Sequence, residues 1–178
     1  MPITLYPLPK QTVGPEERFE KLFHVDVEVD DVLPDLHCVY VEDMGDHYSW
    51  LLENRISELG VSINEIKSLS MRCLRDKIDK YAEIEVLERG IYSVFGLETI
   101  ESSVVFASDI INKFGFNSKK HLVSIPNRES FLFCDQDDSD ARERMEKLAM
   151  EIYDESKASR KLTTRLIKIE NDQSLHYV

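Results

Sequence analysis

The sequence predicts an α+β fold with a mostly antiparallel sheet, built from two strand-strand-helix units and preceded by a strand and a helical hairpin. Apolar residues recur at spacings of three and four in 62–78, the period of a helix. Two pairs of short strand-like segments, at 81–95 and 121–134, are each followed by another helical pattern. The 178 residues fit a single domain, and we expect the helices to cover one side of the sheet.

Prolines dominate the N-terminal segment, 1–34, which holds five of the six in the chain. Because proline lacks a backbone N–H, this segment is expected to hold no long regular element. A short helix is predicted at Glu16–Phe23, directly after Pro15. The α+β core is therefore expected at 35–178.

The core should begin with the strand Leu36–Val41, which is rich in β-branched and aromatic residues. A polar loop at 42–46 follows, and then a helix at Tyr48–Leu59 with leucine and isoleucine turned inward. Gly60 is predicted to end that helix in a left-handed conformation. The next helix, 62–78, should start with a capping box in which Ser62 and Glu65 bond each other's backbone N–H.

The first strand-strand-helix unit is predicted as a hairpin of 81–87 and 91–95, then a helix capped by Ser102 or Ser103 and ended by Gly115. Alternation places Ala82, Ile84 and Val86 on one face of its first strand. The inward residues of its helix should be Val104, Val105, Ala107, Ile110, Ile111 and Phe114. The second unit pairs 121–125 with 130–134 across a turn at 126–128 and continues into a helix at 139–156, before a final strand at 163–169.

The charge balance is acidic, with 34 carboxylates against 22 basic side chains and a net charge of −12. Such a field repels phosphate backbones, so we expect no nucleic-acid partner and favour a basic protein partner. The alternative is that acidity only maintains solubility. The start of the chain lacks a signal-peptide pattern, no run of 18 apolar residues occurs, and the three cysteines form no framework, so the interpretation is a cytoplasmic protein that binds no membrane.

Reaction signatures are absent from the sequence, and we predict no catalytic residue, no metal site and no cofactor. The acidic segment 135–146 partly matches a calcium-binding EF-hand loop, but Asp140 stands where the sharp turn requires glycine. These acids equally suit the start of a helix. Asp46 and His47, beside Glu42 and Asp43, form the one local carboxylate and imidazole cluster.

Charged and aromatic residues in the 42–46 loop, at the start of the following helix, in the 126–128 turn and in the acidic run 135–140 are the candidates for partner binding. Trp50 beside acidic residues suits an interface, although burial in the core is the alternative. Arg128 at the second hairpin turn can bind a carboxylate with both arms of its guanidinium, although Asn127-Arg128 can also serve only the turn. The candidate set is Glu42, Asp43, Asp46, Trp50, Asp137, Asp138 and Arg128.

Four segments carry a family resemblance: HCVYVED at 37–43, ISELGVSINEI at 56–66, VVFASDII at 104–111 and SIPNRESF at 124–131. In their order they resemble the YtpQ-like family of bacterial domain-of-unknown-function proteins. The chain differs at 96–103, where GLETIESS replaces a glycine-rich or aromatic loop. The resemblance implies a bacterial cytosolic protein and transfers no catalytic residue.

The sequence thus favours a non-enzymatic binding protein, for example an immunity-type protein that neutralises a basic toxin. One alternative is a hydrolase or metal-dependent enzyme that uses the 42–47 loop. A third hypothesis is a structural subunit of a larger assembly.

Overall fold

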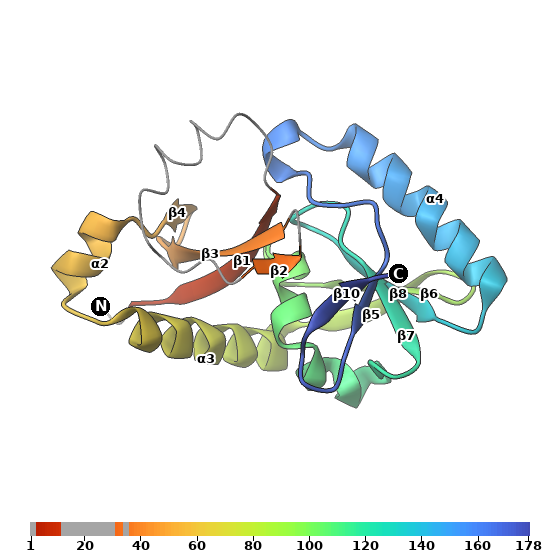
Figure 1. Cartoon of the computed structure of the whole chain (residues 1–178), viewed down its shortest axis with the longest axis horizontal. Helices are drawn as coiled ribbons and strands as arrows, with labels where there is room; N and C mark the ends of the chain where they lie inside the picture. Colours follow the sequence, from red (N-terminus) through yellow and green to blue (C-terminus); the bar gives the residue numbers. More distant parts are fainter. Residues whose placement is uncertain (1–2, 12–30, 34–35) are drawn as a thin grey trace.

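The computed structural model describes residues 3–11, 31–33 and 36–178, and these form an α+β fold with antiparallel sheets (Figure 1). The predicted fold class is therefore confirmed. The predicted helix at Glu16–Phe23 lies outside the described residues.

The first sheet is centred on β3 (Leu36–Asp43), which extends the predicted strand by two residues. β1 (Leu5–Gln11) pairs along one edge of β3, whereas β2 (Asp31–Leu33) and β4 (Tyr48–Trp50) pair with its two ends. The sequence predicted only that prolines would interrupt long regular elements here, and the seven-residue β1 runs through Pro7 and Pro9. These prolines are two residues apart, so their missing donors fall on the same side of β1, which is compatible with a strand that has one neighbour.

The helical hairpin consists of α2 (Glu53–Leu59) and α3 (Ile63–Tyr81). Gly60 ends α2 with φ of 65°, and Ser62 and Glu65 form the predicted capping box at the start of α3. The prediction that the first helix starts at Tyr48 was wrong, because residues 48–50 pair with β3 before α2 begins. α3 also continues to Tyr81, which was assigned to the following strand.

The second sheet has six strands in the order β10, β9, β7, β8, β6, β5. The two predicted hairpins are β5 (Glu83–Glu88) with β6 (Ile91–Phe95) and β7 (His121–Ser124) with β8 (Phe131–Asp135). The predicted strand at 163–169 is reduced to β9 (Ile167–Ile169), and β10 (Leu175–Tyr177) completes the edge.

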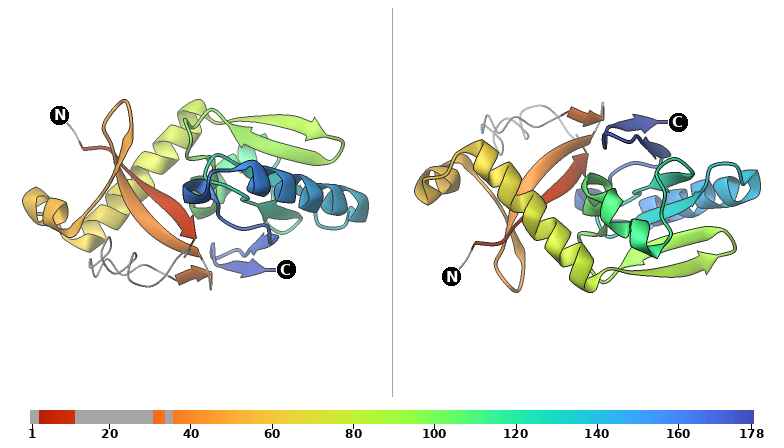
Figure 2. Two further views of the ribbon diagram at one scale, coloured as in Figure 1. Left: turned by 90° about the horizontal axis from the view of Figure 1, so that it is seen from above. Right: turned by 90° about the horizontal axis from the view of Figure 1, so that it is seen from below.

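Helices cover both faces of the second sheet, which corrects the expectation of one covered side. Leu132 and Cys134 of β8 pack against α4 (Ser139–Glu155), with Ala141 and Met145 of that helix in contact with this face. Phe131 and Phe133 point to the opposite face, into a cluster that also contains α3 and first-sheet residues. Figure 2 shows α3 running diagonally across the first sheet and ending where β5 begins.

The segment after β6 forms two 3₁₀ helices, η1 (Glu101–Phe106) and η2 (Ser108–Phe114), instead of one α-helix. Ser102 and Ser103 lie inside η1 and are buried, so neither caps a helix as predicted. Gly115 does end the segment, with φ of 95°. Phe114, which was expected in the core, is exposed. Val86 is also exposed, and it lies on β5, an edge strand of the sheet.

Candidate functional site

A polar pocket of about 480 Å³ lies where four segments distant in sequence meet. The β3–β4 loop supplies one wall, the loop after β6 supplies another, and the turn between β7 and β8 contributes together with the end of η3 (Ala158–Arg160). Its described lining is Asp43, Gly45, Asp46, His47, Tyr48, Glu98, Thr99, Arg128 and Arg160.

The β3–β4 loop forms the acidic rim of the pocket. The Asp43 carboxylate accepts a hydrogen bond from the backbone N–H of Gly45 at 2.8 Å, which fixes the turn. Asp46 is 87% exposed at its side chain, and its Oδ1 lies 2.6 Å from Nδ1 of His47. This bond with His47 is the main reason that the pKa of Asp46 lies below its ordinary value, so Asp46 is charged at neutral pH.

The loop after β6 holds an unusual backbone conformation at the pocket wall. Glu98 and Thr99 are consecutive non-glycine residues with φ of 56° and 77°. This conformation costs free energy for residues with a Cβ, and most for a β-branched one. The neighbours Leu97 and Ile100 are fully buried, so the packed core holds the loop in this strained form.

Lys77 of α3 is the buried cation beneath this loop, with a side chain that is 6% exposed. Its Nζ donates to Oε2 of Glu98 at 2.6 Å and to the Tyr48 hydroxyl at 3.2 Å. Burial alone would lower the pKa of Lys77, but these two hydrogen bonds outweigh it and raise the pKa. The Tyr6 ring, 5.1 Å from Nζ, completes the surroundings of the ammonium group. Lys77 therefore links α3 to two walls of the pocket.

Arg128 and Arg160 form the basic part of the pocket. The backbone N–H of Arg128 donates to the carbonyl of Arg160 at 3.0 Å, so the two residues are held side by side. Arg160 forms an ion pair with Glu129. Burial lowers the pKa of Arg128, and the charge of Arg160 lowers it further. Arg128 Nε is buried and has no hydrogen-bond partner.

The structure brings together three of the seven predicted partner-binding residues, since Asp43, Asp46 and Arg128 line the same pocket. Glu42 does not belong to the site: it is buried in the first sheet, and Arg55 of α2 pairs with both of its carboxylate oxygens. Trp50 is half-buried against the main core, with Lys10 over its ring.

Asp137 and Asp138 lie at the other end of the chain's fold, in the turn before α4. Asp138 caps α4 by accepting a hydrogen bond from the N–H of Ala141 at 2.9 Å. The N–H of Asp137 donates to Oδ1 of Asp135 at 2.9 Å. Both residues therefore organise a helix start, which is the alternative to the EF-hand interpretation that the sequence left open.

The side chains that line the pocket are mainly carboxylates, one imidazole and two guanidinium groups. No serine or cysteine occurs among its described lining residues, and the His47 imidazole is bonded to a rim carboxylate. Within the described part of the chain, no group of three or more histidine, cysteine, aspartate or glutamate side chains is placed to hold a metal ion. What the pocket offers is exposed carboxylates around a basic floor.

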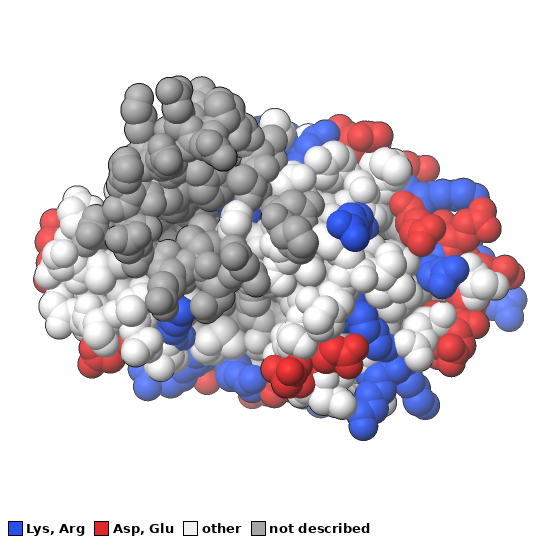
Figure 3. All heavy atoms as spheres, in the orientation of Figure 1, with Lys and Arg blue, Asp and Glu red and all other residues white. Residues whose placement is uncertain are grey.

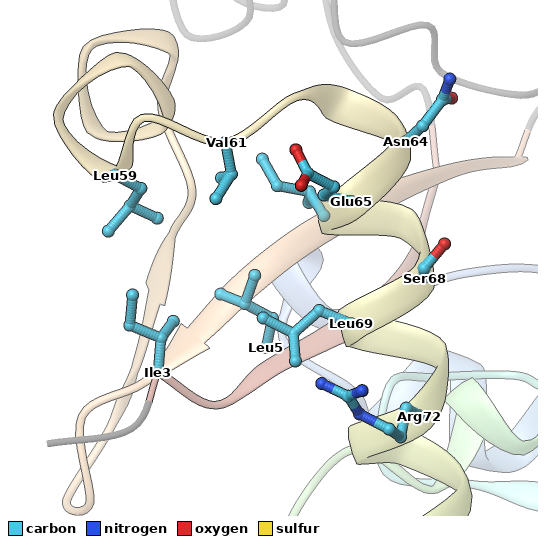
Figure 4. A pocket seen from close by; sticks show the side chains of 10 residues that line it. Ile3, Leu5, Leu59, Val61, Asn64, Glu65, Ser68, Leu69 and Arg72 are labelled. Carbon is cyan, nitrogen blue, oxygen red and sulfur yellow. The ribbon is translucent and has the colours of Figure 1, made fainter.

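A second hollow, of about 440 Å³, lies at the corner between α2 and α3. Figure 4 shows Ile3, Leu59, Val61 and Leu69 turned toward one another around it, whereas Asn64 and Ser68 point away. Glu65 at its edge is already used by the capping box. The hollow is mainly apolar, and Arg72 brings a guanidinium to its edge (Figure 4).

Glu98, Thr99, Arg160, Tyr48 and Lys77 complete the site but were missed from the sequence. None of them belongs to a motif, and their contacts join residues 21 or more positions apart. The one sequence feature that could have indicated an unusual loop is Gly96, two residues before Glu98, which adopts a φ of 91°.

No protein-family model, curated protein or solved structure matches this chain. The resemblance to the YtpQ-like family accordingly stays a prediction. In the portion of the chain that is described, no helix combines the length and apolar character needed to traverse a lipid bilayer.

Proposed function

We propose that this chain is a non-enzymatic binding protein that engages a basic protein partner at the polar pocket. The observation that carries the proposal is the convergence of four distant segments on one pocket, one of them in a strained conformation. Strain of this kind concentrates at ligand sites, because the surrounding fold must hold it in place at a cost to stability.

The rim supplies the groups that such a partner needs. Glu98 is 77% exposed and Asp46 87% exposed, so each carboxylate can meet lysine or arginine side chains while it keeps its contact with Lys77 or His47. The net charge of −12 adds a long-range attraction that speeds encounter with a basic surface. Over α4, Figure 3 shows acidic side chains interspersed with basic ones, so that face presents no field of a single sign.

The experiment compares two charge reversals that change the net charge equally. Asp46→Lys alters the pocket rim, and Asp137→Lys alters an exposed acid in the turn before α4. With the purified chain as bait in host lysate, we expect a stoichiometric basic partner with the native protein and with Asp137→Lys. Asp46→Lys should weaken capture by about tenfold, equivalent to about 1.4 kcal/mol of binding free energy. Equal loss with both variants, or no stoichiometric partner, would contradict the proposal.

A specific form of this proposal is an immunity-type protein that neutralises a basic toxin, such as a nuclease. Fast, charge-steered association is what such a protein requires. A toxin-like reading frame beside the gene would support it, and co-expression with that toxin should protect cells only when the pocket rim is intact.

A second candidate is a hydrolase that uses the 42–47 loop. It is favoured by the 2.6 Å contact between Asp46 and His47, which can orient an imidazole as a general base. Hydrolase activity that is lost in His47→Ala, with partner capture unchanged, would establish this candidate over the binding protein.

A further inference from the structure

We propose that the polar pocket binds an anionic oxygen group, a carboxylate or a phosphate, through the guanidinium of Arg128 with Arg160 beside it. This inference rests on the proposed binding role of the same pocket and names the chemistry of the group that enters it.

Three cationic side chains gather on one side of the pocket. Lys10, Arg128 and Arg160 lie together, and burial together with the charge of Arg128 lowers the pKa of Lys10. Lys10 Nζ donates to a backbone carbonyl, that of Ser159, at 2.8 Å. Glu129 pairs with Arg160, so the three cations share this one ion pair among the described residues. Asp43, Asp46 and Glu98 line the other walls of the pocket, so the position that favours an anion is the one beside Arg128 and Arg160.

The Arg128 guanidinium has unused hydrogen-bonding capacity. Its Nε is buried without a partner, and no described residue accepts a hydrogen bond from its guanidinium. By contrast, both arms of Arg75 bond the carboxylate of Asp109, at 2.9 and 2.8 Å. A buried donor without an acceptor is costly, so a ligand that brought an acceptor to the Arg128 guanidinium would gain binding free energy.

The carboxylates of the pocket already have hydrogen-bond partners other than Arg128. Glu98 pairs with Lys77, Asp46 with His47, and Asp43 accepts from the N–H of Gly45. None of these carboxylates is within hydrogen-bonding distance of Arg128. Among the described residues, no carboxylate of the pocket therefore serves as an acceptor for Arg128.

Hydrogen bonds fix the backbone of Arg128 in the β7–β8 turn. Its N–H is bonded to Arg160, and its carbonyl accepts from the N–H of Ser102 at 3.2 Å. Asn127 fixes the turn through its side-chain oxygen, which accepts from the N–H of Glu129 at 2.9 Å. The backbone that carries the Arg128 side chain is therefore fixed, which reduces the entropic cost of binding a carboxylate or a phosphate there.

The test titrates ¹⁵N-labelled protein with sodium phosphate or with sodium acetate, at an ionic strength held constant with sodium chloride. We expect saturable shifts of the Arg128 Nε–H resonance and of the amides of Glu98 and Thr99. Tighter binding of phosphate would identify a phosphorylated group as the natural ligand, and tighter binding of acetate a carboxylate. Shifts no larger than those caused by chloride alone would overturn the inference, and this native titration decides even if a variant fails to fold.

Variants assign the binding to the guanidinium. Arg128→Gln should raise the dissociation constant about tenfold or more, and Arg128→Lys less, because lysine keeps the charge but not the fork. Arg75→Gln removes an arginine charge outside the pocket and should leave the constant within about twofold. Unchanged affinity in Arg128→Gln would overturn the inference. The titration contains no partner protein, so absence of anion binding would not contradict the proposed partner. Likewise, failure to capture a partner from lysate would not change the result of the titration.

Discussion

Glu98 connects the pocket to the stability of the fold through its pairing with Lys77. Replacing it with glutamine leaves a buried ammonium without a counter-charge, although Tyr48 still accepts a hydrogen bond from it. Since Glu98 itself is mostly exposed, we expect Glu98→Gln to lower the free energy of unfolding by about 1 kcal/mol at pH 7. Urea denaturation measures this change.

The same pair gives a pH dependence of definite sign. The hydrogen bond from Lys77 holds the pKa of Glu98 below its ordinary value of 4.5. The stabilisation is therefore fully present above pH 4.5 and is lost as the pH falls through the lower folded-state pKa. The difference between native protein and Glu98→Gln should shrink on acidification, whereas Glu83→Gln, at an exposed position on β5, should show no comparable trend. A constant difference from pH 7 to strongly acidic pH would contradict the assigned role of the pair.

Gly96 is required at the entrance of the strained loop for a steric reason. A Cβ at this position would lie 2.5 Å from the carbonyl oxygen of Tyr81, and φ is already 91°. We expect Gly96→Ala to lower the free energy of unfolding by more than about 2 kcal/mol. Gly115→Ala is the control, because φ is 95° there and nothing lies within 4 Å, so only the conformational cost of about 1 kcal/mol applies. Similar losses in both variants would show that the contact with Tyr81 is unimportant.

At the scale of single elements, the start of α3 was predictable because its determinants are local. Ser62 and Glu65 are three residues apart, and both hydrogen bonds of the capping box form. We expect Ser62→Ala to lower the free energy of unfolding by about 1 kcal/mol, measured by urea denaturation. Ser68→Ala, at an exposed position inside the same helix, should change it by less than about 0.5 kcal/mol. Equal effects of the two changes would argue against the cap.

Elements whose form depends on distant partners were not predictable. Residues 48–50 have apolar character compatible with either a helix or a strand, and their pairing with β3 decides for a strand. Likewise η1 and η2 replace the expected α-helix where the segment packs into the core shared by both sheets, with Val104, Val105 and Ile111 fully enclosed. The site shares this limit, because Lys77 and Glu98 meet only in the folded chain.

At the scale of the whole molecule, the main hydrophobic cluster joins the two sheets. Leu8 and Val39 of the first sheet lie in the same cluster as Val123 and Ile167 of the second. We expect the two sheets to unfold together in one cooperative transition. Trp50, the one tryptophan in the chain, reports on the first sheet by fluorescence, and far-ultraviolet circular dichroism reports on all elements. Two separate urea midpoints would show that the sheets are independent units.

The composition gives the net charge of the whole molecule, but it does not show which charged side chains face a ligand. Of the carboxylates singled out in the sequence, Glu42 serves the interior of the first sheet and Asp138 caps a helix. Asp43 and Asp46 instead line the pocket, together with Arg128 and Arg160. The negative net charge gives no sign that two arginines lie there. Composition therefore predicts the sign of the long-range field, whereas topology decides which charges face a ligand.

Hydrogen–deuterium exchange of the complex with the captured partner tests most directly that the polar pocket is the binding site. We expect simultaneous protection of 43–48, 97–100 and 126–129, three segments that are distant in sequence and line one pocket. Protection confined to α4 or to the apolar hollow at the α2–α3 corner, with these three segments exchanging as in the free protein, would contradict the account.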